Sequence, residues 1–228
     1  GIRDYKVTGV QTCALPIYIA SKVTLDATGN GASITFKSLA SNFSSLEAIA
    51  DDGITVQSDL NTTVGDLKLE ADADNTSDGF DQILVENGAS ILSANDLILD
   101  ATSGGMSATD TLVMEANENV IINDPLSLFA NTTLYADKDD DGSGSLVTSG
   151  DVTGDGQDLT IYGSDINLSN SIDLGTGTLS LFATNSHNIS IGTSTTNTYQ
   201  LSNDELALLD AGDLFIGSAD SGDRKSTR

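Results

Sequence analysis

The sequence predicts an all-β protein, and within that class a parallel β-helix whose end coils lack complete caps. Three observations predict this class. One short strand pattern recurs along the chain, helix signals are nearly absent, and Ser, Thr, Asn, Asp and Gly fill the turns between short apolar runs. A chain that reuses one strand in this way is built by stacking, and such a protein presents surface more than a single pocket.

The recurring pattern is Leu-x-Ala, or once Met-x-Ala, followed by Asp, Asn or Thr. In six of its seven copies an apolar residue also precedes the Leu or Met by two positions, so three alternate side chains point to one face of the strand. The copies lie at 25–28, 69–72, 99–102, 114–117, 128–131, 134–137 and 181–184. We expect them to form one wall of a stack.

The remaining elements are short. Apolar triplets predict further strands at 83–85, 120–122, 166–168, 172–174 and 189–191. Two similar stretches, 45–56 and 203–216, each predict one helical turn that leads into a strand, and Ser202 and Glu205 have the spacing of a capping box. The acidic turns that follow 69–72 and 134–137 predict a larger repeat with a period of about 65 residues.

The alternation of apolar and polar residues along each predicted strand decides the topology. Ordinary parallel sheets are covered by helices on both faces, but here helices are missing and one face of each strand is polar. A parallel β-helix satisfies both facts, and coils of roughly 20 to 25 residues would give on the order of 8 to 10 coils in a rod about 40 to 50 Å long. The alternative is an antiparallel sandwich or a string of immunoglobulin-like domains, which the scarcity of Asn-Gly and Asp-Gly hairpin turns disfavours.

The two ends of the chain differ from the rest. Residues 1–17 and 223–228 resemble translated sequencing adapter: VTGVQTCALPI at 7–17 is what a common short-read adapter encodes, and DRKSTR at 223–228 matches the start of its reverse complement. We expect both ends to be disordered artefacts and 18–222 to be the β-helix segment, which starts and stops within a longer gene. The ends hold Cys13, five of the nine basic and two of the 34 acidic residues, so 18–222 keeps four basic and 32 acidic residues.

This acidic balance excludes some partners. A strongly negative surface repels nucleic acid and anionic lipid, so we expect no nucleic-acid partner. No apolar run has the length of a membrane-spanning segment. The absence of cysteine from 18–222 is common among exported bacterial surface proteins.

Several features resemble the repeat regions of giant filamentous haemagglutinin-like proteins of bacteria. They are the recurring strands, the Asp-rich turn that ends in Gly-Ser-Gly-Ser-Leu146, the strand end Ile191-Gly192 and the unit 201–217. The resemblance implies a right-handed β-helix in the stalk of a large adhesin, secreted or held at the bacterial cell surface, that serves cell adhesion or biofilm contact. It also implies contact with a host or neighbouring-cell surface, glycans included, and an outer-membrane secretion partner for the full-length protein.

The strongest chemical candidate is a calcium site in the Asp-rich turn. Its ligands would be Asp137, Asp139, Asp141 and Ser143, since D-x-D-x-D-G places three carboxylates around a tight turn. It is not an EF-hand, because the twelfth position is Thr148 and not Glu. A second partial loop is expected at 151–156, and Asp72, Asp74 and Asp78 occupy the matching turn of the preceding large repeat. The competing interpretation is a solvated acidic turn without metal. No other cofactor is expected.

The sequence argues against an enzyme. Some β-helices are polysaccharide lyases or hydrolases, and Asp139 with Asp141 could form a carboxylate pair. Such lyases also need a basic residue, and the four lysines of 18–222 are isolated in the sequence, while His187 is the only histidine. We therefore expect no catalytic residues, with a fragment of a carbohydrate-active β-helix enzyme as the remaining alternative. Aromatic residues at strand positions predict packing on an outer face or at a corner before they predict sugar binding: Phe129, Tyr135, Tyr162, Phe182 and Phe215.

Overall fold

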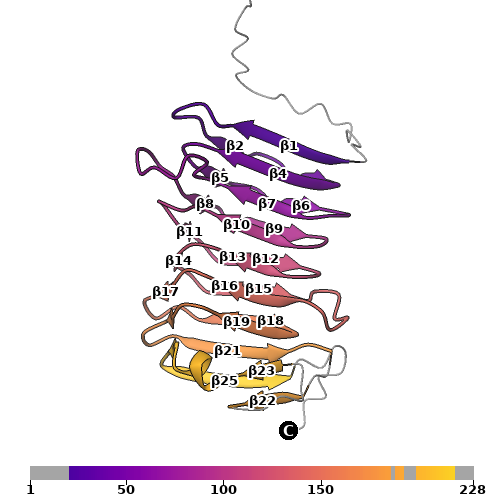
Figure 1. Ribbon diagram of the computed structural model, residues 1–228, viewed down its shortest axis with the longest axis vertical. Coiled ribbons are helices and arrows are strands. Elements are labelled where there is room, and N and C mark those ends of the chain that lie inside the picture. Colours follow the sequence, from indigo (N-terminus) through magenta and orange to yellow (C-terminus); the bar gives the residue numbers. More distant parts are fainter. Residues whose placement is uncertain (1–20, 186–187, 193–198, 219–228) are drawn as a thin grey trace, which may run out of the picture.

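The computed structural model describes residues 21–185, 188–192 and 199–218. The chain winds into a parallel β-solenoid of about seven turns, and Figure 1 shows its strands stacked in chain order from one end to the other. Every strand pairing among the described residues is parallel, so the all-β, parallel β-helix prediction is confirmed and the antiparallel alternative is wrong. Both adapter-like ends and His187 lie outside the described residues.

Three sheets form the walls, and each complete turn contributes one strand to each. Sheet A contains β1 (Lys22–Ala27), β4 (Ser45–Ala50), β7 (Leu67–Glu70), β10 (Leu97–Asp100), β13 (Val120–Ile122), β16 (Ser145–Thr148) and β19 (Asp165–Leu168). Sheet B contains β2 (Ile34–Phe36), β5 (Ile54–Val56), β8 (Ile83–Val85), β11 (Met106–Ala108), β14 (Leu126–Leu128), β17 (Val152–Gly154), β20 (Ile172–Asp173) and β24 (Leu209–Asp210). Sheet C contains β3 (Ser41–Phe43), β6 (Leu60–Thr62), β9 (Ser90–Ser93), β12 (Leu112–Ala116), β15 (Thr132–Ala136), β18 (Leu159–Gly163), β21 (Thr178–Ala183) and β25 (Asp213–Ser218). A fourth, two-stranded sheet pairs β22 (Ile189–Ile191) with β23 (Tyr199–Leu201).

The core is a set of apolar ladders that run along the axis. Alternate residues of each strand point inward, and the parallel register puts each inward side chain directly against its equivalent in the next coil. In sheet A one such ladder consists of Val23, Leu46, Leu67, Leu97, Val120, Leu146 and Ile166. Each fully buried aliphatic side chain stabilises the fold by roughly 1.5–3 kcal/mol, so the alternation seen in the sequence is the main determinant of the solenoid.

The ends of the stack are less well covered than its middle, as the expectation of incomplete caps requires. Val23 and Leu25 of β1 are only partly buried, although they point toward the core. At the other end Leu214 of β25, the sheet partner of the buried Leu179, is about half exposed. Inward positions of the central coils, such as Leu97, have no exposed surface.

The number and length of the coils differ from the prediction. About seven turns replace the expected 8 to 10, because loops lengthen two of the coils and the last step of sheet B, from Ile172 to Leu209, also contains β22, β23 and α1. The coil from Leu67 to its partner Leu97 contains the loop 71–82, between β7 and β8. The coil from Val120 to its partner Leu146 contains the loop 137–144, between β15 and β16. A coil without such a loop, from Leu146 to Ile166, is the shortest step along this ladder.

Two predictions are wrong: the larger repeat of about 65 residues, and the assignment of all the recurring strands to one wall of the stack. The two acidic turns that suggested the repeat lie at different corners: one follows β7 of sheet A, and the other follows β15 of sheet C. The recurring strand pattern occurs in all three sheets, for example at 99–102 in A, 128–131 in B and 181–184 in C. Every wall needs the same inward alternation and a turn at its end, so the pattern marks a strand without marking its wall.

Of the two predicted helical turns one is present. Helix α1 (Asn203–Leu206) begins with the expected capping box: the Glu205 N–H donates to Ser202 Oγ at 3.2 Å, and the Ser202 N–H donates to the Glu205 carboxylate at 2.9 Å. The stretch 45–56 is instead strand β4 and then β5. Leu46, Ala48 and Ala50 are buried on one side of β4, a period of two that overrides the local likeness to α1.

Candidate functional site at the acidic corner loops

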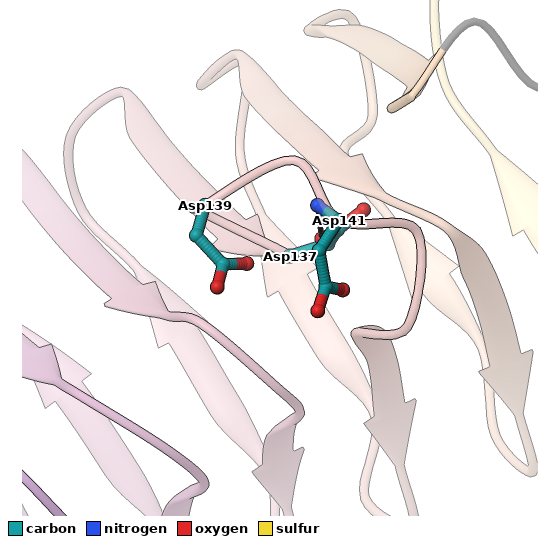
Figure 2. Close-up of side chains that lie close together, drawn as sticks. All are labelled: Asp137, Asp139 and Asp141. Atoms are coloured by element: carbon teal, nitrogen blue, oxygen red, sulfur yellow. Dashed lines mark hydrogen bonds between the residues drawn. The ribbon is translucent and has the colours of Figure 1, made fainter.

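The loop 137–144 brings together three of the four predicted calcium ligands. One carboxylate oxygen each from Asp137, Asp139 and Asp141 lies within 4.8 Å of the other two, and Figure 2 shows the three side chains on this loop. Asp137 is buried at the end of β15, whereas Asp139 and Asp141 are exposed on the loop. The fourth residue, Ser143, donates its hydroxyl hydrogen to the Asp141 carboxylate.

The Asp137 carboxylate is the centre of a hydrogen-bond network. Its Oδ1 accepts from the N–H groups of Asp141 at 3.0 Å and Gly142 at 3.1 Å, and the Gly142 N–H also lies 3.1 Å from Oδ2. The Thr184 hydroxyl, which follows β21 two coils further along, donates to Oδ2. Protein donors therefore set the shape of this loop, and a metal ion at Asp137 would compete with them.

A second pair of contacts ties the loop to the same distant segment. The Asn185 N–H donates to the Asp140 carboxylate, and the Asn185 side-chain amide donates to the Asp141 carbonyl at 2.9 Å. Thr184 and Asn185 were not identified from the sequence, which carries no local signal for partners so far apart along the chain. Only the winding of the solenoid brings them to the loop.

The field around the loop is negative. Partial burial raises the pKa of Glu118, and the nearby carboxylates of Asp141, Asp96 and Asp139 raise it further. Lys138 is the basic residue of the loop, but its Nζ pairs with Glu115 at 2.8 Å and lies 4.1 Å from the centre of the Tyr135 ring. The arrangement attracts cations, and Lys138 does not neutralise the Asp cluster because it pairs with Glu115.

The second partial loop predicted at 151–156 is wrong. Residues Val152–Gly154 form β17 inside sheet B, so they cannot wrap around an ion. Asp151 accepts from the Ser171 hydroxyl at 2.8 Å and from the Ser171 N–H at 3.1 Å. These bonds, the hydroxyl first, lower the pKa of Asp151 and give it a structural role between two coils.

Many corner carboxylates act in the same way, as acceptors for the backbone of the following coil. Asp59 accepts from the N–H of Ser90 at 2.9 Å, and Asp158 accepts from the N–H of Thr178 at 2.8 Å. At another corner the Asp165 carboxylate accepts from the Gln200 N–H at 3.0 Å. The sequence suggested that the acidic side chains of the turns are simply solvated. Part of them instead accept hydrogen bonds from backbone N–H groups near the ends of the strands.

The aromatic residues form a ladder on the outer face of sheet C. Ring centres are 4.5 Å apart between Tyr135 and Tyr162, 5.0 Å between Tyr162 and Phe182, and 5.4 Å between Phe182 and Phe215. This confirms packing on an outer face for these four rings. Within the ladder each ring face is covered by the next ring, and only the terminal ring, Phe215, keeps an exposed side. Phe129 lies apart from the ladder, exposed in the turn after β14.

The lysines of the described solenoid do not gather around an acidic pair of the kind a lyase uses. Lys22 pairs with Glu47 at 2.7 Å, and Lys68 pairs with Glu70 at 2.7 Å, both across the outer face of sheet A. Asp139 and Asp141, the candidate carboxylate pair, lie on an exposed loop.

Comparison of the chain with protein-family models, with curated proteins and with solved structures finds no match in any of the three. The resemblance to filamentous haemagglutinin-like repeats is thus supported at the level of the solenoid fold and no further. Among the described residues, no helix has both the length and the apolar character needed to cross a membrane.

The charge pattern predicts that mild acid stabilises the protein. Burial is the first cause of a raised pKa at four carboxyl groups: Asp78, Glu118, Asp124 and Asp165. A carboxyl whose pKa is higher in the folded state stabilises the fold at low pH and loses that contribution as pH rises through the folded pKa. We expect Tm to rise as pH falls from about 7 to about 5.

Two groups oppose this trend but act lower on the pH scale. The pKa of Glu47 is lowered, first by its hydrogen bond from Lys22, and that of Asp151 is lowered by Ser171, so their contributions are lost only as pH falls below the ordinary carboxyl range. Thermal melts in dilute and in concentrated NaCl check the prediction. Salt should flatten the rise, because it screens the like charges; a Tm that falls steadily from pH 7 to 5 would contradict it.

Proposed function

We propose that this chain is a non-catalytic stalk segment of a large bacterial adhesin, secreted or held at the cell surface, which extends a contact site away from the cell. The observation that carries the proposal is the continuity of the three sheets: sheets A, B and C run without interruption through the central coils. A solenoid whose strands pair only with those of the neighbouring coils gains length by addition of coils. Seven coils correspond to roughly 34 Å of rod.

The surface chemistry agrees with a spacer role. The outer face is acidic, which keeps an extended protein soluble and limits adventitious contact with anionic lipid and nucleic acid. The rings of the aromatic ladder on sheet C stack on one another between successive coils, so they serve packing. Contact with a host or neighbouring-cell surface, glycans included, would then be made by other parts of the full-length protein, exported through its outer-membrane partner.

A deletion that keeps the phase of the solenoid tests the proposal. Removing 97–165 takes out three whole coils, because Leu67, Leu97 and Ile166 occupy the same position in sheet A. We expect the shortened chain to fold, with a rod about 14 Å shorter. Displayed on bacteria between a membrane anchor and a known binding module, it should support less attachment to a polymer-coated surface than the full chain.

The matched control deletes 97–158. It removes almost as many residues, but it joins β9 to β18, two strands that both belong to sheet C, so the solenoid should not form. Equal folding of both deletions would contradict modular stacking. Attachment that is promoted by the segment without any binding module, or that does not depend on length, would overturn the stalk function.

A second candidate function is calcium binding at the loop 137–144, favoured by the approach of three carboxylates within 4.8 Å. Terbium luminescence with the chain and with an Asp139→Asn/Asp141→Asn double variant tests it. Both substitutions lie on the exposed part of the loop and leave the Asp137 network in place. Equal terbium binding by the two proteins would remove this loop as a calcium site.

A further inference from the structure

The loop 71–82, at the corner between sheets A and B, contains two carboxylates in which only one of the two oxygens accepts hydrogen bonds. Asp72 stands at the beginning of the loop and Asp81 at its end, and each is about 2 % exposed. Asp72 Oδ2 accepts from the Ser103 N–H at 2.7 Å. Asp81 Oδ2 accepts from the N–H groups of Asp78 and Gly79, both at 3.2 Å.

The other oxygen of each carboxylate has no partner. Asp72 Oδ1 and Asp81 Oδ1 are both shielded from solvent, and neither receives a hydrogen bond from any of the described residues. A buried carboxylate oxygen without a donor or counter-charge is strongly unfavourable. Natural proteins resolve such a group with a paired cation, a metal ion, an ordered water or a proton. Two orphaned oxygens on one loop that is crowded with further carboxylates make a bound cation a candidate partner.

No ion pair of the described residues supplies that charge at this corner. The ion pairs of the described chain involve Glu47, Glu70 and Glu115, and none of them reaches the loop. Further carboxylates surround it: those of Asp74, Asp51 and Asp52 are close enough to Asp78 to act on its charge. The local field is therefore negative, and a bound cation would be attracted and retained.

Both aspartates also border the same turn of the next coil. Asp72 contacts Ser103 through its carboxylate, and the Asp81 carbonyl lies so close to Gly104 that a Cβ on that glycine would approach it to 2.4 Å. The neck of the loop is thus held against residues 103–104 at both of its ends. Oxygen ligands in an irregular, flexible arrangement suit Ca²⁺ better than Mg²⁺, which demands a near-ideal octahedron.

We propose that the neck of the loop 71–82 binds Ca²⁺, with Asp72 Oδ1 and Asp81 Oδ1 as its buried carboxylate ligands and with loop carbonyls and water completing the shell. The site is separate from the loop 137–144, which lies at a different corner. It does not depend on the stalk function. Calcium there would fix this long loop of the solenoid against the following coil.

The test compares four forms of the full chain: wild type, Asp72→Asn/Asp81→Asn, Asp139→Asn/Asp141→Asn and the quadruple variant. Each is titrated with CaCl₂ by calorimetry and melted in EDTA, CaCl₂, and MgCl₂ or NaCl at equal ionic strength. We expect the Asp72→Asn/Asp81→Asn protein to bind Ca²⁺ at least about 10-fold more weakly than wild type at one site. The Asp139→Asn/Asp141→Asn protein should keep that binding event.

The melts give a second signature that does not need tight binding. In EDTA the Asp72→Asn/Asp81→Asn protein should melt at or above wild type, because it no longer buries two unpaired charges. In CaCl₂ the order should reverse, since only wild type is stabilised by the ion. The proposal is overturned if wild type responds no more to CaCl₂ than to MgCl₂, or if the variant in EDTA melts below wild type and binds Ca²⁺ unchanged.

Discussion

Replacement of Gly150 by Ala is expected to destabilise the solenoid by at least about 2–3 kcal/mol. Gly150 is buried between β16 and β17, and a Cβ there would lie 2.2 Å from the carbonyl carbon of Asp124 and 2.4 Å from the nitrogen of Pro125. These are backbone atoms of the preceding coil, which cannot rotate away as a side chain could. Parallel strands are held about 4.8 Å apart, so relief requires the coils to separate.

The neighbouring hydrogen bonds make that separation costly. The Ser149 N–H donates to the Ile122 carbonyl at 2.9 Å, and the Leu126 N–H donates to the Asp151 carbonyl at 2.9 Å, one on each side of the contact. A coil that moves outward to admit the methyl group must lengthen both. The cost should therefore appear as global destabilisation of the adjoining coils and not as a local adjustment.

Gly29→Ala is the matched control. Gly29 has an ordinary φ, and a Cβ there would meet nothing within 4 Å. Alanine should be neutral or should stabilise by about 0.4–1 kcal/mol through its smaller unfolded-state entropy. Urea denaturation followed by far-UV circular dichroism checks both. Equal midpoints for Gly150→Ala and wild type would show that the corner is looser than its geometry indicates.

The fold was predictable because its main determinant is local. Residues such as Leu46, Leu67 and Leu159 alternate with polar neighbours, and a period of two without helical cover leaves few architectures other than a stack of parallel strands. The phase of the coils was not predictable from that pattern. Leu99-Asp100-Ala101 and Leu181-Phe182-Ala183 are nearly the same phrase, yet they lie on different walls, because all three walls impose the same alternation.

The candidate site shows the same division between local and distant information. Proximity of Asp137, Asp139 and Asp141 follows from a single tight turn, and the sequence predicted it. The partner Thr184 of Asp137 depends on how many residues the two intervening coils contain, a quantity that the loop insertions change. Local motifs therefore predicted which carboxylates gather, but not which of them the protein itself already satisfies.

The distinction matters for calcium. Asp137 looks like the best ligand in the sequence, but four contacts from three protein donor groups occupy its two oxygens. Asp72 and Asp81 belong to no compact D-x-D motif with each other, but each retains an orphaned buried oxygen. A buried carboxylate oxygen without a hydrogen-bond partner is a stronger indication of a cation than a carboxylate in a D-x-D motif. The reason is that such an oxygen destabilises the fold until a donor or a cation binds it.

Replacement of Asp137 by Ala is expected to destabilise the protein by about 3 kcal/mol, measured by urea denaturation in EDTA. The substitution leaves the N–H groups of Asp141 and Gly142 without their carboxylate acceptor and removes the tie to Thr184. Hydrogen bonds to a charged acceptor each contribute roughly 1.5–3 kcal/mol, and the effects of bonds in one network do not add fully.

Asp139→Ala in the same loop is the control, because its exposed side chain lies in a field of like charge; its effect in EDTA should stay within about 0.5 kcal/mol. The pair also separates the two interpretations of the loop. If protein donors hold it, Asp137→Ala is the more damaging change with or without calcium. If an ion holds it, the two substitutions should become equally damaging in CaCl₂ and nearly harmless in EDTA, and that result would contradict the network built around Asp137.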